Sequence, residues 1–155
     1  MNWYNVTWWF FYILIAIGLQ QNFPGLDFLL PGFIIAVQER NVAQVGWVGL
    51  FFILLQEGLG SLAFGGTIMW YLLAIVWFFI AYNLFEVESF LFIFLLSGIL
   101  ATMHLAVFYM IASLQNIPVN NTKIMEESVY QALMTPFVWW AAQWTRKFVP
   151  HEDPA

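Results

Sequence analysis

The sequence predicts an all-α membrane protein, a helical bundle with about six transmembrane segments, the second short and the third ending in a glycine-rich break. Three observations predict this class. Of the 155 residues 63% are hydrophobic and only 8% charged, whereas soluble domains carry about 25% charged residues because their surface must face water. Mean hydropathy is +0.80. Apolar runs recur along the chain, several near the roughly 20 residues that a helix needs to cross a bilayer.

The first two segments differ in length. The first is Trp8–Leu19, extendable back to Trp3, and its leading aromatic residues suit the headgroup level. The second has an apolar part, Phe28–Val37, that is about 15 Å long as a helix, or half a bilayer. Pro31 is best tolerated in a first helical turn, which favours a helix from about Leu30 to Glu39. The sequence leaves open whether this segment crosses the membrane or re-enters.

The remaining predicted spans are Gln44–Gln56, Thr67–Phe85, Phe90–Ala112 and Glu126–Lys147. Pro118 excludes a continuous helix through the loop before the last span. That span is expected to have its acidic residues in the first turn and Arg146 and Lys147 in the last turn, as the helix dipole favours. Pro136 lies in its middle and predicts a kink.

We expect one transmembrane domain, residues 1–148, followed by a polar tail, residues 149–155. The N-terminal apolar run has no preceding basic residue and no small-residue cleavage site after it, which favours a retained span over a signal peptide. With six crossings and a cytoplasmic N-terminus, Arg40, Arg146 and Lys147 fall on the cytoplasmic side and Lys123 outside. This arrangement follows the preference for basic residues in cytoplasmic loops.

The stretch "LLQEGLGSLAFGGT" places a carboxylate and four glycines within the apolar part of the chain, namely Glu57, Gly58, Gly60, Gly65 and Gly66. One interpretation is that Glu57 ends the third helix at the headgroups. Another is a turn packed against other helices, in which the carboxylate accepts hydrogen bonds from backbone amides and glycine allows tight turning or close approach. A transport site at a broken helix is the third alternative.

Residues able to support other chemistry are few. His104 is the only histidine within a predicted span, since His151 lies in the tail, so we expect no bis-histidine haem and no metal site. A neutral His104 hydrogen-bonded to a neighbouring helix is the favoured interpretation, and Gly98–Ala101 offers a weak small-residue packing face. Cysteine is absent, and no serine lies in a nucleophile motif. We therefore expect no enzyme, no cofactor and no nucleic-acid partner.

Taken together, three segments resemble the bacterial rod-shape-determining membrane protein MreD family. "LPGFIIAV" (Leu30–Val37) is similar to that family's proline-led short second segment. "GLFFILLQEGLGSLAFGG" (Gly49–Gly66) is similar to its acidic and glycine-rich turn, with Glu57 where the family usually has Asp. "SVYQALMTPFVWWAAQWTRKF" (Ser128–Phe148) is similar to its last span, including Pro136 and the basic exit.

The resemblance implies a non-enzymatic scaffold subunit of the cell-shape and cell-wall elongation machinery in the bacterial inner membrane, with both termini cytoplasmic. It implies a fold like that of the substrate-binding membrane components of vitamin transporters. The implied partners are an MreC-like bitopic protein, RodA, a class B penicillin-binding protein and MreB. Two alternatives stay open: a small-molecule carrier component in which Glu57 and His104 face a midplane cavity, and an accessory subunit of a membrane complex.

Overall fold

The computed structural model describes residues 3–59, 65–84, 86–87, 89–116 and 118–149. These ranges hold six α-helices and no β-strand. The helices are α1 (Trp3–Asn22), α2 (Leu30–Gln38), α3 (Val42–Leu59), α4 (Gly66–Tyr82), α5 (Phe90–Gln115) and α6 (Asn121–Arg146). The all-helical class predicted from the sequence is confirmed, and each predicted segment corresponds to one helix.

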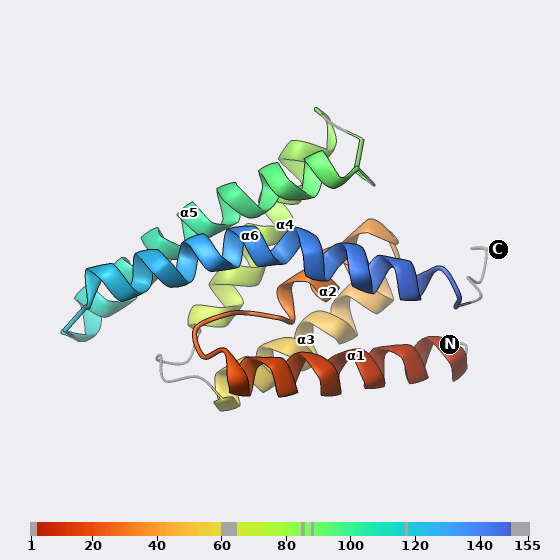
Figure 1. The fold of residues 1–155 in the computed structure, drawn as a ribbon, viewed down its shortest axis with the longest axis horizontal. Coiled ribbons are helices and arrows are strands. Elements are labelled where there is room, and N and C mark those ends of the chain that lie inside the picture. The colour runs from red at the N-terminus through yellow and green to blue at the C-terminus, as the bar shows by residue number, and fades with distance from the viewer. Residues whose placement is uncertain (1–2, 60–64, 85, 88, 117, 150–155) are drawn as a thin grey trace.

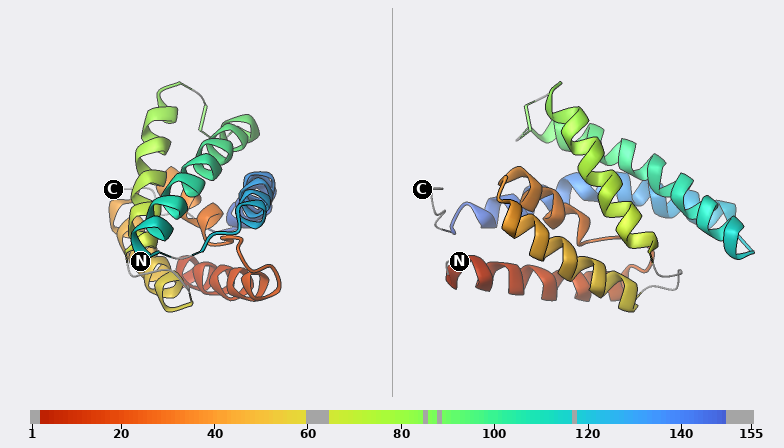
Figure 2. Two further views of the ribbon diagram at one scale, coloured as in Figure 1. Left: turned by 90° about the vertical axis from the view of Figure 1, so that its left-hand side faces the viewer. Right: turned by 180° about the vertical axis from the view of Figure 1, so that it is seen from behind.

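The short helix α2 lies at the centre of the bundle (Figures 1 and 2). It packs against α3, α4 and α6. All residues from Leu30 to Val37 are buried, because a helix that is apolar all round has no face for a polar environment. Pro31 stands in its first turn, as expected, and the observed helix ends one residue before the predicted Glu39.

The five long helices run back and forth along the molecule. Figure 1 shows the start of α1 and the end of α6 near one end of the bundle, together with the turn from α2 to α3, while the turn from α5 to α6 lies at the opposite end. The linker after α1 returns from that opposite end to the middle of the bundle, where α2 begins. Non-helical chain therefore lies next to the start of α2 and extends its path along the bundle.

Helix α6 begins earlier than the sequence predicts. It starts at Asn121, and the side chain of Asn120 caps it by accepting a hydrogen bond from the Lys123 amide at 3.2 Å. Consequently no acidic residue lies in its first turn, and the predicted dipole match at that end was wrong. At the other end Arg146 lies in the last turn, as predicted, whereas Lys147 is the C-cap residue that follows the helix.

Helix α6 continues through Pro136 without a break. Proline lacks the amide hydrogen that would bond to the carbonyl four residues earlier, which belongs to Ala132. The hydroxyl of Ser97 on α5 lies 2.9 Å from that carbonyl oxygen and 2.8 Å from the Phe94 carbonyl oxygen, and it can donate to either. The close pairing of α5 with α6 thus supplies the partner that Pro136 removes.

Within the described chain, α5 alone is both long enough and apolar enough to cross a membrane. The apolar helices Val42–Gly58 and Gly66–Tyr82 are shorter than 18 residues. Helix α6 has the length, but it carries buried polar residues such as Gln131, Thr135 and Arg146. The described residues therefore establish six helices, of which α5 has the length and apolar content of a membrane span.

Candidate functional site

Polar side chains gather at the two ends of the buried helix α2. At its N-terminal end lies Asp27, in the linker from α1. Its Oδ1 accepts hydrogen bonds from the amides of Leu29 (2.9 Å) and Leu30 (3.0 Å). It therefore occupies two of the amide donors that a helix leaves unpaired at its start.

Two other helices also donate to the Asp27 carboxylate. The Gln56 amide of α3 donates to Oδ1 at 2.8 Å, and the Tyr71 hydroxyl of α4 donates to Oδ2 at 3.3 Å. None of the four basic residues of the chain makes a recorded ion pair with Asp27 in the described ranges. The carboxylate is thus held by hydrogen bonds and by the start of α2 instead of by a countercharge.

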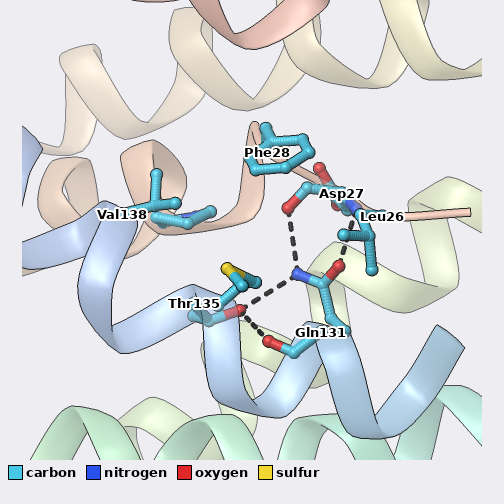
Figure 3. A pocket seen from close by; sticks show the side chains of 8 residues that line it. Leu26, Asp27, Phe28, Gln131, Thr135 and Val138 are labelled. Atoms are coloured by element: carbon cyan, nitrogen blue, oxygen red, sulfur yellow. Dashed lines mark hydrogen bonds between the residues drawn. The ribbon is translucent and has the colours of Figure 1, made fainter. Parts of the chain in front are cut away.

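The backbone of Asp27 is bound by Gln131 of α6 (Figure 3). Gln131 Oε1 accepts from the Asp27 amide at 2.7 Å, and Gln131 Nε2 donates to the Asp27 carbonyl at 2.9 Å. The same Nε2 lies 3.0 Å from the Thr135 hydroxyl. One side-chain amide therefore satisfies both polar groups of a non-helical residue, which buried irregular backbone requires where water is absent.

A small groove lies beside this cluster, lined by residues around Asp27 and by Gln131, Met134, Thr135 and Val138 of α6 (Figure 3). Its empty volume is about 160 Å³, part of which is open to the outside. Pockets that enclose small molecules begin at about 300 Å³. Neither Glu57 nor His104 lines the groove, so the arrangement expected for a carrier is not found at this position.

At the C-terminal end of α2 lies a second network, here termed the terminal clasp, built from Asn5, Glu39, Gln44 and Arg146. Arg146 donates to both carboxylate oxygens of Glu39, at 2.6 and 2.9 Å, and to the Asn5 side chain at 2.6 Å. Asn5 in turn donates to Gln44 at 2.9 Å, and Gln44 donates to Glu39. Arg146 is only 4% exposed, so this ion pair is a bidentate, buried one.

Aromatic residues border the terminal clasp. The guanidinium carbon of Arg146 lies 4.8 Å from the ring centre of Trp8 and 5.5 Å from that of Trp9. The Trp8 indole also donates to the Thr145 hydroxyl at 3.1 Å. Arg146, which the sequence suggested as a cation at the basic exit of the last span, is therefore a buried structural residue that joins α6 to α1 and α2.

Trp139 of α6 adds a further contact at the C-terminal end of α2, because its indole donates to Oε1 of Gln38, the last residue of that helix, at 2.8 Å. Gln38 also donates to the Val87 carbonyl at 2.6 Å, which ties the α4–α5 connection to α2. Gln131, Thr135, Trp139 and Arg146 thus form one polar seam along α6. This seam fixes the position of α2 along its own axis, since α2 can slide only by breaking bonds at both ends.

Glu57 lies in the last turn of α3 and is partly buried. Its carboxylate accepts hydrogen bonds from the Gly65 amide (3.1 and 3.2 Å) and from the Thr67 amide (3.0 Å) at the start of α4. This is the second of the interpretations offered by the sequence, in which the acid accepts from amides of a turn. The geometry makes Glu57 a bridge between α3 and α4.

The glycines near Glu57 differ from one another. A Cβ on Gly66 would lie 3.1 Å from Ile111 of α5, which is a close approach, whereas Gly58 has nothing within 4 Å. Gly65 also has open space, but its φ of +105° favours glycine for backbone reasons. Among the described residues, close approach is therefore found at Gly66 and a turn conformation at Gly65, whereas Gly58 shows neither, and Gly60 lies outside the described residues.

His104 packs its ring edge-on against Trp70 of α4, with the ring centres 5.0 Å apart. Its Nδ1 is buried and has no hydrogen-bond partner in the described part of the chain, so the expected bond from this nitrogen to a neighbouring helix is not found. Gly98 is exposed and has nothing within 4 Å of a Cβ, which also contradicts a packing role inside the protein.

Sequence reasoning missed Asp27, Gln131 and the pairing of Glu39 with Arg146. Asp27 could have been noticed, because an aspartate shortly before an apolar helix is a helix-start signal. Gln131 and Thr135 lie four residues apart, which places them on one face of α6. Their partners could not be found in this way, since the hydrogen bonds span more than 100 residues of sequence.

These observations define the class as an all-α, six-helix protein whose central short helix is fixed by polar contacts at both ends. Comparison with protein-family models, with curated proteins and with solved structures finds no match. The resemblance to the MreD family therefore remains a prediction from the residues themselves.

Proposed function

We propose that the protein is a multi-pass membrane protein of the bacterial inner membrane with six crossings, the second made by α2 and its linker. Large apolar side chains face outwards on every long helix. Phe10, Leu50, Phe79, Leu91 and Trp140, one from each of these helices, are all more than half exposed. Apolar exposure on all sides suits a lipid environment, whereas a soluble monomer keeps contiguous apolar patches small.

Within the membrane, we propose a non-enzymatic scaffold subunit of the cell-wall elongation machinery, binding the transmembrane helix of an MreC-like partner. The interior supports a structural role, because its main polar residues bond to one another and the groove beside Asp27 is small. A protein with this interior and short connections offers mainly its outer helix faces to a partner. RodA, a class B penicillin-binding protein and MreB belong to the same proposed assembly.

The observation that carries the proposal is where the three MreD-like segments lie. Leu30–Val37 forms most of α2, Gly49–Gly66 contributes Gln56, which bonds to Asp27 at the start of α2, and Ser128–Phe148 covers the polar seam of α6. Glu57, in the same segment as Gln56, joins α3 to α4. Segments that resemble the family only as separate stretches of sequence thus meet around one buried helix.

The test is co-purification in mild detergent of the tagged chain with a co-expressed MreC-like protein, with an unrelated tagged multi-pass protein as control. We expect the partner to be recovered with this chain and not with the control. A monodisperse monomer without any membrane partner would contradict the scaffold. Ligand-dependent thermal stabilisation that is lost in Glu57→Ala or His104→Ala would instead favour the carrier alternative.

A further inference from the structure

We propose that α1 is a displaceable helix, hinged at the linker after Asn22 and held against the bundle by the terminal clasp together with Trp8. This inference rests on the membrane location in the proposed function, but not on the identity of any partner.

Helix α1 is held at a distance from its neighbours by large side chains. Each other described helix runs close to at least one neighbour, whereas α1 has no such close partner. Its apolar contact with α3 includes Trp9, whose ring lies 5.9 Å from that of Trp47 and 6.1 Å from that of Phe52. Small residues that let two helix backbones approach are the usual basis of tight association in membranes.

Lipid changes what such apolar contacts contribute. Hydrocarbon is as apolar as the protein interior, so no hydrophobic force drives helices together in a bilayer. Rings that leave Trp47 and Phe52 would meet lipid at little cost in transfer free energy. The free energy that keeps α1 against the bundle therefore depends more on its hydrogen bonds to other elements than on these apolar contacts.

Those hydrogen bonds gather at the N-terminal end of α1. Asn5 bonds to both Gln44 and Arg146, and the Trp8 indole bonds to Thr145. Further along, the Tyr12 hydroxyl donates to the Phe28 carbonyl at 2.7 Å. The second half of α1 is joined to the bundle chiefly by the covalent linker and by apolar packing, which includes the buried Ile13 and Ala16.

The linker has the features of a hinge. Pro24 lies two residues after the end of α1, and Gly25 has a φ of +95°, in the region that favours glycine. The clasp lies at the other end of a 20-residue helix, about 30 Å away along the axis. A hinge at one end and polar bonds at the other allow α1 to swing as a rigid rod once those bonds and the bond from Tyr12 to Phe28 break.

Swinging α1 outwards would uncover the side of α2 that carries Gly32. In the closed arrangement the Tyr12 ring occupies the space in which a Cβ on Gly32 would lie. Displacement of α1 thus exposes a glycine on a helix that is otherwise wholly buried. The clasp decides when this surface becomes accessible from the membrane.

The experiment measures spin-label distances in nanodiscs, using the full chain, which has no native cysteine. One label pair, at Leu14→Cys and Leu50→Cys, reports α1 against α3. A second pair, at Leu95→Cys and Leu133→Cys, reports α5 against α6. All four positions are exposed. The clasp is weakened from the α1 side by Asn5→Ala with Trp8→Phe, which leaves the Arg146–Glu39 ion pair in place.

We expect the weakened clasp to add a longer-distance population for the α1–α3 pair, with about a tenfold rise in the open-to-closed ratio for the loss of three interhelical hydrogen bonds. The α5–α6 pair should not change. Thr7→Ala is the matched control, because its hydroxyl bonds to the Trp3 carbonyl within α1, and it should leave both distances unchanged.

Two results would overturn the proposal. One is an α1–α3 distance distribution that is the same in the weakened variant and in the native chain. The other is broadening of both pairs, which would show that the clasp holds the whole bundle. Neither result depends on recovering a partner, so failure here is distinguishable from failure of the scaffold proposal.

Discussion

At the scale of single residues, Gly32 and Gly65 show two different reasons for a glycine. A Cβ on Gly32 would lie 2.3 Å from Tyr12 Cε1, and the Tyr12 ring is anchored by the bond from its hydroxyl to the Phe28 carbonyl. Gly65 has free space but a left-handed backbone. A methyl group is therefore excluded by a neighbour at Gly32 and disfavoured by backbone conformation at Gly65.

We predict that Gly32→Ala is destabilising relative to Gly98→Ala. Alanine favours helix at both positions, but only Gly32→Ala forces the Tyr12 ring to move, at a cost of about 1–3 kcal/mol for overpacking. Thermal unfolding in detergent should show the midpoint of Gly32→Ala several degrees below that of Gly98→Ala. Equal midpoints would mean that Tyr12 moves aside freely.

At the scale of helices, the packing of α5 on α6 includes an exchange of hydrogen-bond donors, in which a side chain of α5 replaces a backbone amide that α6 lacks. Pro136 leaves the Ala132 carbonyl without its partner within α6, and Ser97 lies 2.9 Å from it. The seam residues Gln131 and Thr135 lie in the turn just before Pro136, so the geometry of this turn also positions the contacts to Asp27. An element that appears weakened by proline is thus stabilised by its neighbour.

We predict that the effect of Ser97→Ala depends on residue 136. In the native chain the loss of the hydroxyl should cost about 0.5–1.5 kcal/mol, in the range measured for interhelical bonds in membranes. In a Pro136→Ala background the cost should shrink, because the new amide hydrogen can bond to Ala132. A double-mutant cycle on unfolding free energies measures this coupling, and additive effects would argue against the exchange.

At the scale of the whole molecule, the two ends of the bundle differ in their basic residues. The ion pair of Arg146 with Glu39 brings Arg40 and Lys147 to the same end. Lys123 lies near the start of α6, a 26-residue helix about 39 Å long, and hence at the opposite end. In a membrane this places three of the four basic residues on one side, which the positive-inside rule predicts to be the cytoplasmic side.

We predict that single cysteines at Arg40 and Lys147 react with a membrane-impermeant thiol reagent from the cytoplasmic side only. Cysteines at Asn116 and Lys123 should react from the opposite side only. All four positions are exposed, and the chain has no other cysteine. Labelling of all four positions from one side would mean that both ends of α6 lie on the same side of the membrane. That result would contradict the proposed topology.

Much of the fold could be predicted because it follows from local rules. The predicted helix from about Leu30 to Glu39 differs from the observed α2 by a single residue, since apolar content and Pro31 fix both its existence and its start. The predicted start of α6 was too late because the residues after Pro118 were interpreted as a loop. In the structure Asn120 caps the helix there. The site was predicted only at Glu57, whose amide partners lie within ten residues of it.

The sequence by itself determined the helical class, the order of the six segments and the shortness of the second, because apolar runs and proline act over a few residues. Only the tertiary structure decided that α2 is central, that Asp27 is bound by Gln56, Tyr71 and Gln131, and that Arg146 is buried against Glu39. These pairings depend on which helix faces meet. In a sequence this rich in apolar residues many helix faces have similar composition, and the type of a polar side chain does not identify its hydrogen-bond partner.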